Sequence, residues 1–272
     1  MTVEILEPLA KLTKDLRLAA VQLSDDEARF LVDAYYQMQG DRIRDHHQER
    51  QLLKAHEPAS VLSYLGEQHE MLEKQIGKAL DAYSAGKPIG QWMRSVVGIG
   101  PVISAGFIAH IDINRAETAS HIWRFAGLDP SVKWEKKTRR PWNATLKVLC
   151  WKLGESFVKT SNHKDSFYGP IYAQRKAFEI ARSERGECAE AAASALAAKR
   201  IGKDTEAYKA YSQGKLPPAQ LHARACRYAV KLFLSHLHEK WRTMEGLPVR
   251  EPYMVAVGKL TGAPHQKIEP PN

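Results

Sequence analysis

A glycine turn between two apolar segments constrains this chain more than any other feature. In "SVVGIGPVISAGF", residues 95–107, Gly98 and Gly100 flank one isoleucine, and Pro101 follows directly. Glycine lets a backbone bend without side-chain obstruction, and proline is well tolerated at the first position of a helix, where its missing N–H is no loss. The pattern therefore predicts a short helix, a tight turn near Val97, and a second helix that begins at Pro101.

Helical periodicity also fills the chain on the N-terminal side of this turn. Residues 25–54 read as one helix that Ser24 can cap, and residues 59–83 carry apolar side chains at helical spacing. Pro58 stands between the two. Two such helices around a proline predict an antiparallel hairpin or a coiled-coil-like arm.

The C-terminal part reads as further helices. Residues 171–200 are rich in alanine and charge, with an interruption expected at Gly186, and a long amphipathic helix begins at Pro218 after a linker with a short helix. We therefore predict an all-α protein in three parts: a helical arm (1–87), a helix-hairpin-helix module (88–170), and a C-terminal helical region with a disordered tail (171–272).

The sequence argues against several classes of protein. It has no apolar run long enough to span a membrane, its N-terminus lacks the apolar core of a signal peptide, and its three cysteines form no CxxC motif. We therefore expect a cytoplasmic protein with reduced thiols and no membrane partner. The glycines form no nucleotide-binding fingerprint, and no βαβ alternation surrounds them, which argues against ATP or NAD.

Positive charge is concentrated in one segment. The net charge is +9, and residues 133–176 hold eleven basic against three acidic residues, a local excess of +8. Trp134, Trp142 and Trp151 are interleaved with these cations, as in surfaces that stack on bases and contact phosphates. Ordinary solvation of the charges and burial of the tryptophans are the alternative. The candidate nucleic-acid contacts in this segment are Lys133, Lys136, Lys137, Arg139, Arg140 and Lys147.

Two further places are predicted to contact phosphate. The turn would offer main-chain amides from Gly98, Ile99, Gly100 and Val102, because the unpaired N–H groups and the dipole at a helix start bind phosphate without reading bases. In the long C-terminal helix, Arg224, Arg227 and Lys231 share a flank at i, i+3 and i+7. The alternatives are a glycine turn between core helices and a solvated helix face.

Catalytic and metal-binding patterns are not evident. Asp25 and Asp26 read as a helix start rather than as an acid–base pair. His236 and His238 flank one residue, so on a helix they point in different directions, and they have no partner at the spacing of a zinc site. Cys150 lies in an apolar stripe. We therefore predict no metal site, no cofactor and no assigned catalytic residue.

The central segment resembles a known family. "VVGIGPVISAGFIAHI" followed by "HIWRFAGLDP" is similar to the C-terminal domain of the transposases of insertion sequences 110, 116 and 902, over roughly residues 88–160. Phe125, Gly127, Leu128 and Pro130 match the family's aromatic and Gly-Leu-x-Pro element. "RPWNATLKVLCWKL" (140–153) is similar to its last helix. The members of this family contain a helix-hairpin-helix and engage DNA.

The resemblance leaves out the catalytic parts. Family members begin with a RuvC-like nuclease-fold domain that bears four metal-binding acids, whereas the residues before the turn read here as helices. The family's nucleophilic serine lies in a Ser-Gly segment. Here the one serine of that region is Ser131, directly after Pro130 and without a following glycine. The resemblance thus implies the DNA-engaging part of a recombinase without its catalytic apparatus, and Ser131 is only a weak candidate.

Three functions stay open at this point. The favoured one is a DNA-backbone-binding protein related to a transposase, associated with a mobile element or phage and without catalysis. The second is a strand-transfer enzyme with a residual serine or a partner-supplied active site. The third is a helical protein–protein adaptor whose basic patch contacts an acidic partner. Duplex or branched DNA is the expected partner. RNA, and a homodimer through the N-terminal helices, are left open.

Overall fold

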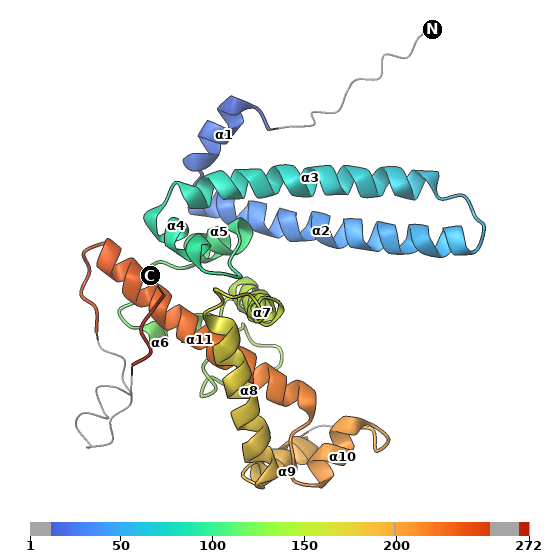
Figure 1. The fold of residues 1–272 in the computed structure, drawn as a ribbon, viewed down its shortest axis with the longest axis vertical. Coiled ribbons are helices and arrows are strands. Elements are labelled where there is room, and N and C mark those ends of the chain that lie inside the picture. Colours follow the sequence, from blue (N-terminus) through green and yellow to red (C-terminus); the bar gives the residue numbers. More distant parts are fainter. Residues whose placement is uncertain (1–11, 199, 251–266, 272) are drawn as a thin grey trace. The chain divides into compact units, whose positions relative to one another are not determined.

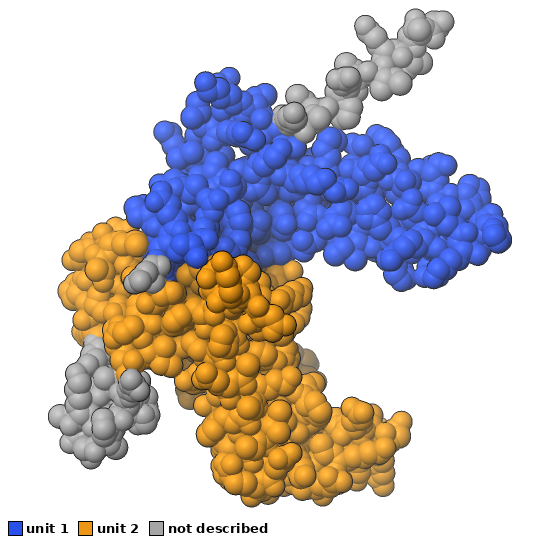
Figure 2. All heavy atoms as spheres, in the orientation of Figure 1, with its two compact units in different colours: residues 1–95, 99–112 blue, residues 96–98, 113–272 orange. Residues whose placement is uncertain are grey.

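The computed structural model describes residues 12–198, 200–250 and 267–271. All regular structure among them is α-helical, which confirms the predicted all-α class (Figure 1). The chain divides into two compact units (Figure 2): residues 1–95 with 99–112, and residues 96–98 with 113–272. The first eleven residues of the predicted arm, where a signal-peptide core would begin, lie outside the described residues. No described helix is long and apolar enough to cross a membrane.

The first unit is built on two long antiparallel helices. α2 (Asp25–Lys54) and α3 (Ser60–Ala85) lie side by side (Figure 1), and the shorter α1 (Lys14–Val21) packs against α3. A capping box starts α2, because the Ser24 side chain accepts from the Glu27 N–H while the Glu27 carboxylate accepts from the Ser24 N–H. The predicted helical hairpin is therefore present, with the first helix at its predicted bounds.

Polar contacts join the two long helices where α2 becomes hydrophilic. Glu73 of α3 is 8% exposed, and its carboxylate accepts hydrogen bonds from Arg42 (2.6 Å) and Gln39 (3.0 Å) of α2. His69 Nδ1 lies 2.7 Å from Asp45 Oδ2. A buried carboxylate needs such partners. These pairs explain how the polar segment of α2 still packs against α3.

The two short helices around the glycine turn complete this unit. α4 (Pro88–Ser95) and α5 (Pro101–His110) contact each other, and α5 also packs against α2 and α3. Every residue of α5 from Ser104 onward is buried, so this small-residue helix forms the centre of the unit. At its C-terminal end, the Arg29 guanidinium donates to the Ala109 carbonyl.

The second unit is organised around one long helix. α11 (Pro218–Met244) packs against α6 (Ala119–Phe125), α7 (Ala144–Lys159) and α8 (Tyr168–Glu184). Phe157, Tyr168 and Phe233 form an aromatic core, with the Phe157 and Tyr168 rings stacked at 4.6 Å. α9 (Ala189–Ala198) and α10 (Glu206–Ser212) pack on each other, and the predicted interruption at Gly186 has φ of +80°.

His236 and His238 of α11 have separate structural partners. His236 lies 2.8 Å from the Tyr168 hydroxyl and 2.8 Å from the Ile268 carbonyl, while His238 lies 2.9 Å from the Ala116 carbonyl. Burial lowers the pKa of both. Within the predicted disordered tail, Lys267 pairs with Glu239 and the Ile268 carbonyl lies beside His236. Residues 262–266 and 272 of that tail lie outside the described residues.

Candidate nucleic-acid interface

The start of the glycine turn is fixed by α7. Gly98 has φ of +97°, a conformation that residues with a side chain rarely adopt. A Cβ there would lie 2.9 Å from Thr160 Oγ1 and 3.3 Å from a Phe157 ring carbon. The Ser156 hydroxyl donates to the Gly98 carbonyl at 2.6 Å. Gly98 is therefore a structural requirement of the packing against α7.

The second glycine has a different environment. Gly100 is the N-cap of α5 with extended backbone (φ −91°, ψ 175°), no side chain caps this helix, and a Cβ would have no atom within 4 Å. Gly100 is exposed and Val102 is half-buried, whereas Ile99 is buried. The first turn of α5 thus reaches the surface of its unit, with the positive end of the helix dipole.

The Gly-Leu-x-Pro element closes α6. The Gly127 N–H donates to the Arg124 carbonyl (3.1 Å) and the Leu128 N–H to the Trp123 carbonyl (2.8 Å), which together form a Schellman motif. Gly127 has φ of +65°, and a Cβ there would lie 2.7 Å from the Trp142 indole. Glycine at this position is therefore required both by the backbone and by the overlying tryptophan.

Asn143 connects the loop to the next helix. Its side-chain oxygen accepts from the Leu146 N–H at 2.8 Å as the N-cap of α7, and its own N–H donates to the Phe125 carbonyl at 2.8 Å. The element resembling the family's last helix therefore begins at a side-chain cap.

The loop between Leu128 and Asn143 carries the exposed cations. Trp134 donates from its indole N–H to the Thr138 carbonyl at 2.9 Å, which gives the loop an internal hydrogen bond. Lys137 has a left-handed backbone, with φ of 71°. The predicted contact residues Lys133, Lys136, Lys137, Arg139 and Arg140 are all exposed.

Tryptophans and cations are paired across the second unit. A cation over an indole face is attracted by the electron-rich ring. The Trp123 N–H also donates to the Lys231 carbonyl at 3.0 Å. Three such pairs occur among the described residues, with the cation 5.4, 4.3 and 4.1 Å from the ring centre: Arg140 with Trp134, Lys147 with Trp142, and Lys231 with Trp123.

Three predicted contact residues from distant parts of the sequence come together. Burial lowers the pKa of the Lys147 ammonium, and the positive charges of Arg227 and Arg140 lower it further. Arg227 is exposed, and desolvation together with the charge of Arg224 lowers the pKa of its guanidinium. Among the described residues, no carboxylate forms an ion pair with Arg140, Lys147 or Arg227. We call these three residues the cationic cluster.

The other two cations of the C-terminal flank have acidic neighbours. The Arg224 guanidinium lies 3.3 Å from the carboxylate of Glu179, a side chain only 2% exposed that also pairs with Arg175. Burial lowers the pKa of the Lys231 ammonium, and the negative charge of the nearby Asp129 carboxylate partly opposes this effect. The predicted flank therefore divides, and only Arg227 joins the cationic cluster.

Ser131 serves in a turn. Its hydroxyl donates to Asp129 Oδ1 at 2.7 Å and its N–H to the same oxygen at 2.9 Å. These two hydrogen bonds lower the pKa of the Asp129 carboxyl, which makes it a weak base. The arrangement is an Asx turn and gives the serine no activating base.

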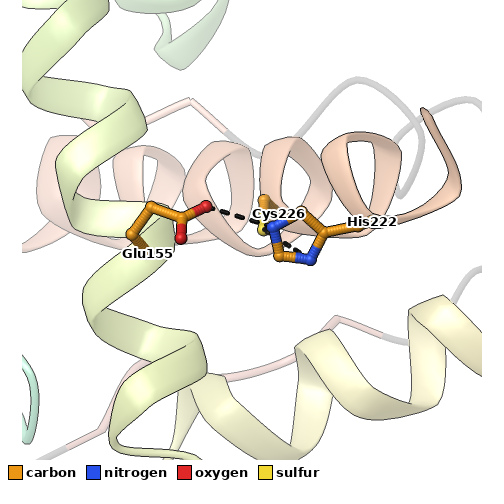
Figure 3. A group of neighbouring side chains, drawn as sticks. All are labelled: Glu155, His222 and Cys226. Atoms are coloured by element: carbon orange, nitrogen blue, oxygen red, sulfur yellow. Dashed lines mark hydrogen bonds and ion pairs between the residues drawn. The ribbon is translucent and has the colours of Figure 1, made fainter. Parts of the chain in front are cut away.

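Sequence reasoning missed one group of polar side chains. Glu155 of α7 lies beside His222 and Cys226 of α11, with ligand-type atoms all within 4.8 Å of one another (Figure 3). From the sequence, only His236 and His238 were weighed as metal ligands and this group was not considered, and the absence of a metal site stays a prediction. The signal was present, because positions four apart on a helix share a face.

Comparison with known proteins bears on the central segment. Residues 90–145 match the transposase family IS116/IS110/IS902. The match runs from α4 to the start of α7 and includes both glycines of the turn, the Schellman element and Asn143. It confirms the resemblance predicted from the sequence and covers 56 of the 272 residues. No curated protein and no solved structure matches the chain.

Proposed function

We propose that this protein binds the sugar-phosphate backbone of nucleic acid, foremost DNA, in a transposase-related role within a mobile element or phage. The observation that carries the proposal is the cationic cluster. Like charges that lie close together and lack ion-paired carboxylates repel one another in the free protein. A phosphate backbone would relieve that repulsion and release its own counterions. The transposase-family match, which includes Arg140, supports DNA as the polyanion.

The remaining predicted residues add contacts that do not read sequence. Gly100 and Val102 would offer main-chain amides at the uncapped start of α5, together with Ile99, while Gly98 shapes the turn. The exposed loop cations Lys133, Lys136, Lys137 and Arg139 would add charge that attracts DNA at long range. Contacts of these kinds position a backbone and carry no direct base specificity.

The salt dependence of binding tests this proposal. If some six phosphates are neutralised, the log–log slope of affinity against salt should be roughly −5. Lys147→Gln and Arg227→Gln should each make the slope shallower by roughly 1, on duplex, branched and single-stranded DNA alike. Lys209→Gln, an exposed lysine of α10, is the matched control and should change little. A flat salt response, or equal effects of all three variants, would contradict the proposal.

The strand-transfer alternative needs a reactive nucleophile. Because the Ser131 hydroxyl is held by Asp129 in a turn, we infer that it has no catalytic role. Incubation with Mg²⁺ and supercoiled plasmid, with Ser131→Ala as the control, separates the two functions. Serine-dependent nicking or joining would favour the enzyme, while binding without any change of the plasmid would favour the backbone-binding protein.

One observation favours the adaptor function beside DNA binding. The hairpin arm exposes large apolar side chains, with Phe30 and Val61 each 73% and Tyr64 60% exposed. Scattered apolar residues such as Phe30 are normal on surfaces, but Val61 and Tyr64 lie one turn apart on α3 and suit a helix–helix contact with a second copy. Light scattering of the wild type and of Val61→Ser with Tyr64→Ser measures this. A monomer at all concentrations would refute self-association through the arm.

A further inference from the structure

Two helices of the second unit bring metal-ligand side chains to one point, and a third adds a hydrogen-bond partner. His222 Nε2 lies 3.1 Å from Glu155 Oε1 and 3.5 Å from Cys226 Sγ. Figure 3 shows the carboxylate of α7 directed toward the imidazole and thiol of α11. On the far side of the ring, the Tyr172 hydroxyl of α8 lies 2.8 Å from His222 Nδ1.

Local packing explains why these side chains meet. Gly154 has no side chain where α7 crosses α11, and a Cβ there would lie 3.3 Å from both Cys226 Cβ and Val230 Cγ2. The close approach places Glu155, the next residue, over the turn of α11 that carries the histidine and cysteine. The group is thus held by helices rather than by a loop, which favours a defined geometry.

We propose that Glu155, His222 and Cys226 bind a zinc ion. Thiolate, imidazole and carboxylate are the three zinc ligands that proteins use. In a tetrahedral site with bonds of about 2.0–2.3 Å, neighbouring ligand atoms are separated by about 3.3–3.7 Å. The nitrogen–oxygen and nitrogen–sulfur distances of this group are close to those values. Three protein ligands leave a fourth position for water or an outside ligand.

Metal binding requires a change of protonation that the surroundings permit. A carboxylate can only accept, so without metal the Nε2–H of neutral His222 donates to Glu155, and Nδ1 accepts from the Tyr172 hydroxyl. With zinc, Nε2 gives its lone pair to the metal, the ring proton sits on Nδ1 and donates to the Tyr172 oxygen, and the Cys226 thiol releases its proton to solvent. Tyr172 then orients the imidazole, as the hydrogen-bond partners of ligating histidines do in zinc sites.

Two of the three ligand side chains are partly open to solvent. Because cysteine binds zinc as the thiolate, binding releases the thiol proton, and zinc affinity should rise with pH. The Glu155 carboxylate and the His222 ring are 30% and 31% exposed, so the ion can enter from solvent.

Cobalt titration tests the site directly. The full chain, purified with a chelator and dialysed, should bind one Co²⁺ with a thiolate-to-metal absorption band in the near ultraviolet that equimolar Zn²⁺ removes. Cys226→Ser should abolish the band, Glu155→Gln should weaken Co²⁺ affinity at least tenfold, and Cys188→Ser should leave both unchanged. Circular dichroism of each variant establishes that it folds.

Two results would overturn the proposal. One is the absence of a thiolate band in the wild type, and the other is a band that persists in Cys226→Ser. Glu155→Gln keeps the inference falsifiable even if the cysteine variant does not fold. The glutamine carboxamide is nearly the same size as the carboxylate it replaces, and the Glu155 side chain is partly exposed. No nucleic acid enters this experiment, so its failure and the failure of DNA binding are distinguishable.

Discussion

Gly98→Ala is expected to destabilise the second unit by about 2–3 kcal/mol. A side chain at a left-handed φ costs about 1–2 kcal/mol. The new methyl would also lie 2.9 Å from Thr160 Oγ1, which itself donates to the Ser156 carbonyl at 2.9 Å. Displacing that hydroxyl forfeits a hydrogen bond of about 1 kcal/mol. For a chain of this size the loss corresponds to a fall in Tm of about 5–10 °C.

The second glycine of the turn provides the matched control. Gly100→Ala adds the same methyl where nothing lies within 4 Å and the backbone is extended. Alanine is a poorer N-cap than glycine, which lowers stability, but it also makes the unfolded chain less flexible, which raises stability. The two effects roughly cancel, so the free energy of unfolding should stay within ~0.5 kcal/mol of the wild type.

Urea unfolding followed by circular dichroism and tryptophan fluorescence measures both variants, and the two probes reveal whether the units unfold together. Combining Thr160→Ala with Gly98→Ala separates the two contributions to the lost stability. The double variant should recover the part due to the contact with the Thr160 hydroxyl but not the part due to the left-handed φ. The reasoning fails if Gly98→Ala is as stable as the wild type, or if Gly100→Ala loses equally much.

Three further outcomes can be measured. Gly100→Val should weaken DNA binding without changing the Tm, because its β-branched side chain fits extended backbone but covers the amides at the start of α5; an unchanged Kd in a fluorescence anisotropy titration would leave the turn a purely structural role. Glu179→Gln should cost about 3 kcal/mol in urea unfolding, since it leaves Arg175 and Arg224 without their buried partner, and a loss under 1 kcal/mol would contradict this. Burial lowers the pKa of His236, so the unfolded chain binds more protons than the folded chain at acidic pH. The free energy of unfolding should therefore fall as the pH drops below about 6.5. His236→Gln should reduce this pH dependence in unfolding measured from about pH 7.5 to about pH 5.

Helices with local start and stop signals could be predicted closely. α2 keeps its predicted bounds because Ser24 and Glu27 cap it and Pro58 prevents continuation into the next helix. α11 begins at Pro218, as predicted, for an equally local reason, since proline is suited to a first helical turn. Signals of this kind need no tertiary information, which is why a single sequence contains them.

The contacts between helices could not be predicted from the sequence. Lys147 and Arg227 were both candidates, but eighty positions separate them, and only the packing of α7 on α11 brings their charges together. In the same way Arg224 appeared equivalent to Arg227 on one helix flank, until α8 placed Glu179 beside it. Periodicity places a residue on a face, whereas the neighbouring helix decides whether its charge is neutralised.

The family match and the proposed binding surface overlap only in part, because Arg140 lies within the match and Lys147 and Arg227 lie outside it. Within the matched segment, Gly98, Gly127 and Asn143 each have a packing or capping reason that holds whether or not DNA is bound. Arg227, in contrast, lies outside the match and has no ion-pair partner among the described residues. A substitution at Gly127 should therefore act through loss of the α6–α7 connection, whereas Arg227→Gln should reduce binding in a folded chain. The matched glycines and Asn143 thus have structural roles of their own, whereas the proposed DNA affinity depends on cations, of which Lys147 and Arg227 lie outside the match.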